Sequence, residues 1–289
     1  MKRMLAVLLA VVTVVALLVP MTSAKKATNE KQEAVMRTAL AYYYRGYGVQ
    51  YDSNPITAYG KYDGGPIRGG YTFSPEDATD DNICFSVCSD YMMQIYYDAF
   101  DWMLMDSVLA TKCNNMMALA HAEGDNPLIA YYYSPFKSSD VAKRSKDITP
   151  EQAAEELKGL LQPGDVMVVM NKDGDTGHAM LYGGDLFNDG NDYMIHCYGG
   201  KYEPSTGANK IETKEKYPTG FGGAIRADKV QDYIFNTNNN NYSIPSGKWE
   251  VIILRPLNVL QSTPLTASAK GRLQYDKLDI CPLSDHTLY

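Results

Sequence analysis

The order of helical and strand-like segments is the feature that most constrains the fold of this chain. Apolar residues recur at helical spacing over residues 28–46, 86–105 and 150–161, whereas short apolar stretches follow Pro163 and Gly164. Helices that precede a run of strands indicate an α+β domain rather than alternating βαβ units. Strands are expected over residues 128–133, 166–170, 178–182, 193–197, 224–227 and 251–255.

Residues 1–24 have the features of a cleavable secretory signal. Lys2 and Arg3 precede an apolar run over residues 5–19, and Ser23-Ala24 supplies small residues for cleavage. An uncleaved membrane anchor is the alternative, but the apolar run is shorter than the ~20 residues of a usual membrane span. We therefore expect a secreted protein, extracellular or associated with the cell wall, that does not remain inserted in a membrane.

The charge of the chain argues against one class of partner. It has 27 basic and 34 acidic residues, a net charge of −7, and loss of Lys2 and Arg3 makes it two units more negative. Because the basic residues form no stripe, we expect no nucleic-acid partner. The ~265 residues that remain are enough for one large domain, expected over 25–262, followed by a tail over 263–289. The sequence leaves the oligomeric state open.

Five cysteines, an odd number, leave at least one thiol unpaired in an exported protein. Their spacing contains no short CxxC pair, so it supports neither a disulfide framework nor a structural zinc site. Asp173 and Asp175 alternate like calcium ligands, but no twelve-residue loop with a closing glutamate follows, and a hairpin turn is the better interpretation. We expect no metal and no cofactor.

Two of the four histidines fall on neighbouring expected strands. His178 lies in the first strand and His196 in the second, with a polar loop over residues 185–191 between them. If the loop is centred near Phe187, the index sum of paired residues is about 374, and the two histidines lie directly opposite each other on one face. One ring would then act as a base while the other holds it in place.

Cys88 is the best candidate for a nucleophile beside these histidines. If Ser86 caps the helix over residues 86–105, Cys88 lies in its first turn, where free N–H groups and the helix dipole lower the pKa of a thiol. Cys84, one turn earlier, is a nearly equal candidate. A cysteine on an apolar helical stripe is also a common small buried residue, so the spacing alone leaves both roles open.

Five segments resemble motifs of the NlpC-type bacterial cell-wall cysteine peptidases, which belong to the papain-like superfamily. They occur along the chain in the same order as the motifs of that family. The stretch that begins Cys88-Ser89-Asp90-Tyr91 is similar to the motif that opens the nucleophile helix in that family. The others are Gly48-Val49-Gln50-Tyr51, Leu161-Gln162-Pro163-Gly164-Asp165-Val166, Gly177-His178-Ala179-Met180-Leu181-Tyr182-Gly183 and Tyr193-Met194-Ile195-His196.

The resemblance implies a papain-like fold and a cysteine hydrolase that cleaves an amide bond in the stem peptides of peptidoglycan. It assigns Cys88 as nucleophile, His178 as base and His196 as the residue that orients the base, with Tyr51 lining the pocket and helping to hold the oxyanion. A related amidase or acyltransferase, or an inactive extracellular binding module of the same fold, are the alternatives.

The chain departs from the family pattern at three places. Val87 replaces an aspartate, and Asp90 replaces a glycine and would raise the pKa of the neighbouring thiol by its negative charge. The distance along the chain from Cys88 to His178 is also longer than in the family, so residues 106–150 are expected to be an insertion.

Overall fold

The computed structural model describes part of the 289-residue chain. The described residues are 24–45, 49–51, 84–86, 88–105, 112–122, 124–136, 145–197, 202–203, 208–209, 225–237 and 242–274. The expected secretory signal therefore lies outside them apart from Ala24, as does most of the glycine- and proline-rich stretch after residue 47.

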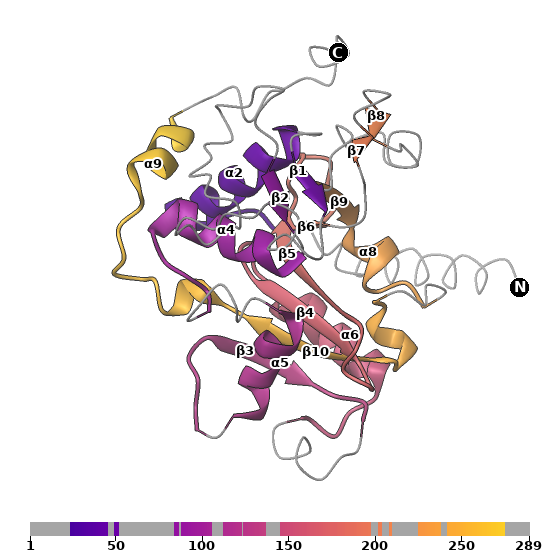
Figure 1. The fold of residues 1–289 in the computed structure, drawn as a ribbon. Coiled ribbons are helices and arrows are strands. Elements are labelled where there is room, and N and C mark those ends of the chain that lie inside the picture. The colour runs from indigo at the N-terminus through magenta and orange to yellow at the C-terminus, as the bar shows by residue number, and fades with distance from the viewer. Residues whose placement is uncertain are drawn as a thin grey trace, which may run out of the picture.

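The centre of the described structure is an antiparallel sheet of six strands in the order β3-β10-β4-β5-β6-β9 (Figure 1). Its strands are β3 (Ile129–Tyr133), β4 (Val166–Asn171), β5 (Gly177–Gly184), β6 (Tyr193–Cys197), β9 (Ile225–Lys229) and β10 (Trp249–Leu254). Two short pairs lie apart from it: β1 (Val49–Tyr51) with β2 (Cys84–Ser86), and β7 (Tyr202–Glu203) with β8 (Ala208–Asn209).

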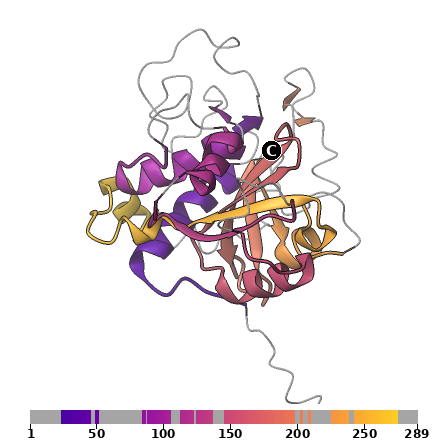
Figure 2. The same ribbon diagram turned by 90° about the horizontal axis from the view of Figure 1, so that it is seen from below.

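Helices cover both faces of the sheet. One core forms between the sheet and the helices α2 (Glu30–Arg45), α4 (Cys88–Phe100), α5 (Cys113–His121) and α9 (Ala267–Leu273). The other forms against α6 (Pro150–Leu160), α8 (Val230–Tyr233) and the 3-10 turn η4 (Ile244–Ser246). In Figure 2 the N-terminal helices and α9 lie together on one side of the strands. The chain is thus an α+β protein with helices on both sides of an antiparallel sheet.

Burial on both faces explains the composition of the central strands. Val166, Val168 and Met170 of β4 enter the first core, while Met167 and Val169 enter the second. A strand buried on both faces has an unbroken apolar run instead of an alternating one, as in Val-Met-Val-Val-Met. The same reasoning accounts for β10, which is buried along its whole length.

Most expected elements are confirmed, with shifted ends. Asn29 accepts a hydrogen bond from the backbone N–H of Gln32 at the start of α2, and Thr149 with Gln152 forms the expected capping box of α6. The expected helix over 86–105 is shorter, because it begins at Cys88 and ends at Phe100. Ser86 is not its N-cap: it lies in β2, where its backbone pairs with Tyr51.

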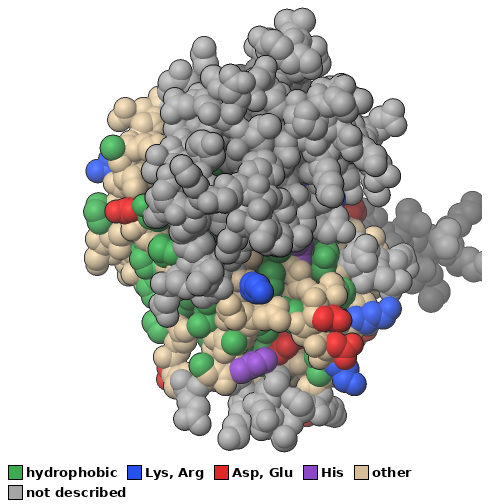
Figure 3. Space-filling view, viewed as in Figure 1, with side chains coloured by type: hydrophobic (Ala, Val, Ile, Leu, Met, Phe, Trp, Pro, Cys, Tyr) green, Lys and Arg blue, Asp and Glu red, His purple; other side chains and the backbone are tan. Residues whose placement is uncertain are grey.

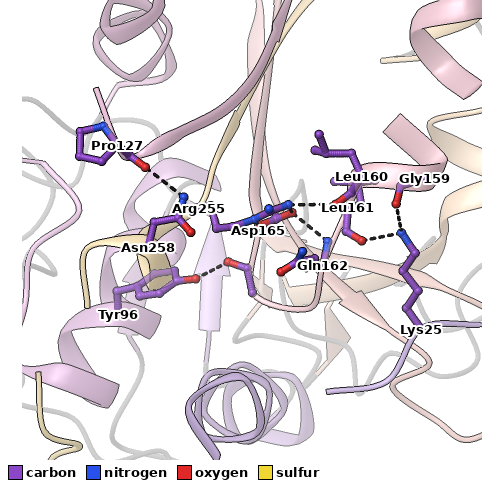
Figure 4. Close-up of polar contacts among 11 residues, drawn as sticks. Lys25, Tyr96, Pro127, Gly159, Leu160, Leu161, Gln162, Asp165, Arg255 and Asn258 are labelled. Atoms are coloured by element: carbon purple, nitrogen blue, oxygen red, sulfur yellow. Dashed lines mark hydrogen bonds and ion pairs between the residues drawn. The ribbon is translucent and has the colours of Figure 1, made fainter. Parts of the chain in front are cut away.

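The Pro163-Gly164-Asp165 turn joins α6 to the sheet and to α4 (Figure 4). The Arg255 guanidinium donates to both carboxylate oxygens of Asp165 at 2.7 and 2.8 Å, and also to the Leu160 carbonyl at 2.9 Å. The Tyr96 hydroxyl of α4 donates to the Gly164 carbonyl. Burial raises the Asp165 pKa, although Arg255 opposes this shift. The turn therefore fixes the position of α4, the helix that carries Cys88.

Lys25 holds the N-terminal segment against the same side of the molecule. Its ammonium group donates to three carbonyls at the end of α6, at distances of 2.6–2.9 Å, and its backbone N–H donates to Asp192 at 2.8 Å. Its carbonyl accepts from the backbone of Asp185 and lies where a Cβ on Gly184 would be only 2.0 Å away. Gly184 also has a φ of +66°, so this contact requires a glycine.

The two segments outside the expected core motifs both contribute to the fold. Within residues 106–150, α5 packs on the sheet and β3 forms one of its edges. Within the tail, α9 packs against α2, with Ala269 and Arg272 buried. None of the helices in the described part of the chain combines the length and hydropathy required to cross a membrane.

Candidate functional site

Cys88 is the first residue of α4 and is buried, with 6% of its surface exposed. The N–H groups of the first helical turn point toward this end of α4 and favour negative charge there. Tyr51, the last residue of β1, pairs with Ser86, which lies two residues before Cys88 in the chain. The side chain of Tyr51 lies outside what the structure describes.

A second thiol faces Cys88. The Sγ atoms of Cys88 and Cys113 are 3.7 Å apart, within hydrogen-bond distance for sulfur, and Cys113 is also buried. Cys113 is the first residue of α5. Sequence reasoning missed this contact, because nothing in the spacing of the cysteines shows that two helices begin at the same point.

The pKa of the Cys88 thiol is held well below its ordinary value. The largest cause is the hydrogen bond with Cys113, and the charge and hydrogen bond of His178 and the backbone of Ala179 act in the same direction. Burial opposes them but does not outweigh them. The net shift of the Cys88 pKa is thus downward, opposite to the direction expected from the charge of Asp90. The charge of Asp90 is among the causes that raise the pKa of Cys113.

His178 and His196 meet, as expected, on one face of the sheet. His178 Nε2 and His196 Nδ1 are 2.6 Å apart, and the ring centroids are 4.8 Å apart with the planes nearly perpendicular. Both side chains are buried. The Tyr242 ring stacks on His178 at 4.7 Å and the Tyr233 ring on His196 at 5.3 Å. These rings restrict how far either imidazole can rotate.

The expected register of the two strands is wrong by two positions. Leu181 pairs with Ile195 and Tyr182 with Met194, so the index sum is 376 instead of 374. His178 and His196 are consequently diagonal neighbours and not directly opposite. Because the shift is even, both side chains stay on the same face. The pair next to the loop, Gly184 and Tyr193, has an index sum of 377, so the loop is centred beyond Phe187. The irregularity between Tyr182 and Gly184, where Lys25 contacts the strand, then lowers the sum by one and makes it even.

Asp228 contacts His196 through the ring nitrogen that does not face His178. His196 Nε2 is 2.8 Å from Asp228 Oδ2, and the same carboxylate accepts from Arg226 at 3.1 Å. Burial lowers the His196 pKa to about 4, and the hydrogen bond with Asp228 only partly opposes that shift. Burial acts to raise the Asp228 pKa, but the hydrogen bond and charge of His196 together with Arg226 make the net shift downward.

These ionisation states define which ring nitrogens of His178 and His196 carry protons. An ionised Asp228 only accepts, so neutral His196 must carry its proton on Nε2 and leave Nδ1 as an acceptor. His178 must then donate from Nε2. Its other nitrogen, Nδ1, is the one left for the Cys88 thiol. The contacts therefore form one row: Cys113, Cys88, His178, His196, Asp228.

The sequence offered a weak indication of Asp228. Ile225 and Ala227 are apolar and buried, whereas Arg226 and Asp228 alternate with them, which is the pattern of a strand with one polar face. The strand was expected to end at Ala227, two residues too early, which left Asp228 outside it. Cys197, next to His196, is buried in the opposite core, as its position in the strand predicts.

A second histidine–carboxylate pair lies at another cavity. His121 Nε2 is 2.8 Å from Glu250 Oε1, and the Tyr132 hydroxyl also donates to that oxygen. The cavity has a volume of about 610 Å³ and is lined by α5, β10 and the β4–β5 turn, including Asn114 and Lys172. Figure 3 shows an exposed histidine over the α5 and β3 region of this face. The turn itself confirms the expected hairpin at Asp173 and Asp175.

Among the described residues, no group of three or more histidine, cysteine, aspartate and glutamate side chains is arranged to hold a metal ion. Comparison of the chain with models of protein families, with curated proteins and with solved structures gives no match in any of the three. We therefore infer the function from the geometry and chemistry of the site itself.

Proposed function

We propose that the protein is a secreted cysteine hydrolase that cleaves an amide bond, with the stem peptides of peptidoglycan as its substrate. The observation that carries the proposal is the row of contacts from Cys88 through His178 and His196 to Asp228. It joins a thiol of lowered pKa to an oriented base, which are the parts that covalent amide hydrolysis needs. The substrate class comes from the resemblance to the NlpC-type peptidases.

The roles follow from the proton positions. The Cys88 thiolate attacks the carbonyl carbon of the scissile amide, and His178 gives the proton that it holds on Nδ1 to the leaving amine. A water molecule, deprotonated by His178, then hydrolyses the thioester and releases Cys88. His196 and Asp228 keep the His178 ring in the productive orientation. We assign stabilisation of the oxyanion to the backbone N–H of Cys88 and to Tyr51.

Purified peptidoglycan and mass spectrometry test this proposal directly. The chain beginning at Lys25 is expected to release peptide fragments whose new termini identify the cleaved bond. In Cys88→Ala the rate should fall by at least about 10³-fold, since loss of a nucleophile removes the covalent route. Cys197→Ala replaces a buried cysteine on the opposite face of β6 from His196, and as the matched control it should retain the release.

Alkylation separates an enzyme from an inactive binding module. A reactive Cys88 is expected to be alkylated by iodoacetamide with a pH midpoint below the ~8.5 of a free thiol. Alkylation of Cys88 with the midpoint of an ordinary thiol, together with no fragment release, would contradict the proposal and favour a binding module. Acyl transfer to an added amine in place of hydrolysis would favour an acyltransferase.

A further inference from the structure

The facing thiols of Cys88 and Cys113 have a geometry that hydrolysis does not require. Each cysteine opens a helix, so two helix N-termini converge on one pair of sulfur atoms. The Sγ–Sγ distance of 3.7 Å exceeds that of a disulfide bond by only about 1.7 Å, a change that side-chain rotation and a small helix shift can supply. The exposed fractions are 6% for Cys88 and 8% for Cys113, which leaves each residue in limited contact with solvent.

We propose that Cys88 and Cys113 are a reversible thiol pair, in which a small-molecule disulfide oxidises Cys88 and Cys113 resolves the product into an internal Cys88–Cys113 disulfide. The pair shares Cys88 with the proposed hydrolase but does not depend on hydrolysis. The disulfide removes the nucleophile from amide chemistry until a thiol reductant restores it.

Two exchange steps account for every atom and electron. The Cys88 thiolate first attacks one sulfur of the reagent R–S–S–R, forms Cys88–S–S–R and releases R–S⁻. Cys113 then loses its proton to that thiolate, attacks the Cys88 sulfur and releases the second R–S⁻. The two cysteines are oxidised to one disulfide, and the reagent is reduced to two thiols once the second R–S⁻ takes up the proton that Cys88 lost on ionisation.

The environment of the two sulfurs supports this division of roles. The Cys88 pKa is lowered, chiefly by the hydrogen bond with Cys113, so Cys88 is the thiolate that attacks first. The same hydrogen bond raises the Cys113 pKa, and burial and Asp90 raise it further. Cys113 therefore stays protonated until Cys88 has become part of a mixed disulfide and has lost its negative charge.

Such a pair would protect an exported nucleophile. A thiolate that meets oxidants passes through reversible states to sulfinic and sulfonic acids that cannot be reduced by thiols. A neighbouring thiol intercepts the reversible state as a disulfide. Cys113 lies 3.7 Å from Cys88, whereas Cys197 is fully buried in the β6 strand.

The test uses the chain from Lys25, reduced and then treated with hydroxyethyl disulfide, followed by acid quenching and mass spectrometry. The wild type is expected to become lighter by two hydrogen atoms and to yield one linked peptide pair that contains Cys88 and Cys113. In Cys113→Ser the adduct of hydroxyethanethiol on Cys88 should accumulate instead. Cys84→Ser and Cys197→Ser are controls, and both should retain the Cys88–Cys113 link.

Two results would overturn the proposal. One is a wild-type protein that keeps the Cys88 adduct as long as Cys113→Ser does, because Cys113 then does not resolve it. The other is a link between Cys88 and Cys84 or Cys197. Neither readout needs hydrolytic activity, so failure to cleave peptidoglycan and failure to form the disulfide are separate outcomes. The wild-type experiment also needs no variant to fold.

Discussion

Two histidine–carboxylate pairs in this protein have the same hydrogen-bond length and very different surroundings. His196–Asp228 and His121–Glu250 are both 2.8 Å apart. The His196 side chain has no exposed surface, whereas 38% of the His121 side chain is exposed. His196 also contacts a second histidine that reaches a thiol, whereas the other contacts of the His121 pair are with Tyr132.

The same histidine–carboxylate hydrogen bond thus occurs in two settings, one fully buried next to a second histidine and one partly exposed to solvent. In the His178–His196–Asp228 row, burial fixes the neutral state of His196 and so determines which way each proton points. At the His121 pair the ring remains open to water, which can replace the carboxylate as its partner. We therefore expect the first cluster to control chemistry and the second to hold α5 against β3 and β10.

The largest difference between the clusters should appear when each histidine is replaced by glutamine. His178→Gln removes the proposed base and is expected to lower the rate of fragment release by about 10²–10⁴-fold. His121→Gln keeps a hydrogen-bonding side chain at the cavity and is expected to change the rate by less than about twofold. Equal losses in the two variants would mean that both clusters contribute to the reaction.

The stability of the protein should depend on pH through His196. Its pKa is about 4 in the folded state, below the ordinary 6.5, so between these values the unfolded chain binds more protons. The contribution of His196 to the free energy of unfolding should thus be complete above about pH 6.5. The free energy of unfolding should fall by on the order of 3 kcal/mol as the pH drops to about 4. Denaturant titrations at several pH values measure this slope.

The matched variant for that measurement is His196→Gln. It has no ionisable ring, so the part of the slope between pH 4 and 6.5 that comes from His196 should disappear. The lowered pKa of Asp228 acts in the same direction but at more acidic pH, where its contribution is lost as the carboxylate is protonated. A slope unchanged in His196→Gln would show that other groups cause it.

Asp228→Asn should give a smaller effect on activity. Asparagine fits the same space but replaces a charge-assisted hydrogen bond worth about 1.5–3 kcal/mol with a neutral one. Fragment release is expected to fall by about 10- to 100-fold. Rates measured across pH will distinguish orientation from folding, since a structural defect alone would lower the rate equally at every pH.

The smallest effect is expected for the corresponding change in the other cluster. Glu250→Gln keeps an acceptor for the Tyr132 hydroxyl and should cost about 1 kcal/mol of unfolding free energy, with fragment release unchanged. A loss of activity similar to that of Asp228→Asn would place the His121 cavity in the reaction and erase the distinction between the two clusters.

Local patterns in the sequence predicted the elements well. Capping residues such as Thr149 and Gln152 act within one helical turn, so the start of α6 could be read directly. The shared face of His178 and His196 was predicted correctly, but it also depends on the register of the two strands, which the irregularity before Gly184 makes even. The α+β class followed from the same local information.

Long-range contacts account for what could not be predicted. The register of β5 and β6 depends on an irregularity at Gly184, where a residue more than 150 positions earlier in the chain lies against the strand. The contact of Cys113 with Cys88 depends on the packing of two helices on one sheet. Asp228 joins the site because β9 pairs with β6 across a stretch that carries no regular pattern.

The anchoring of Lys25 has a consequence for the order in which the protein folds. Its partners lie 133–167 residues later in the chain, at the end of α6 and before β6. During synthesis Lys25 emerges long before those partners do. The bulge at Gly184 can close only when Lys25 and its partners are all present, so the final register of the two histidine strands should be set late in folding.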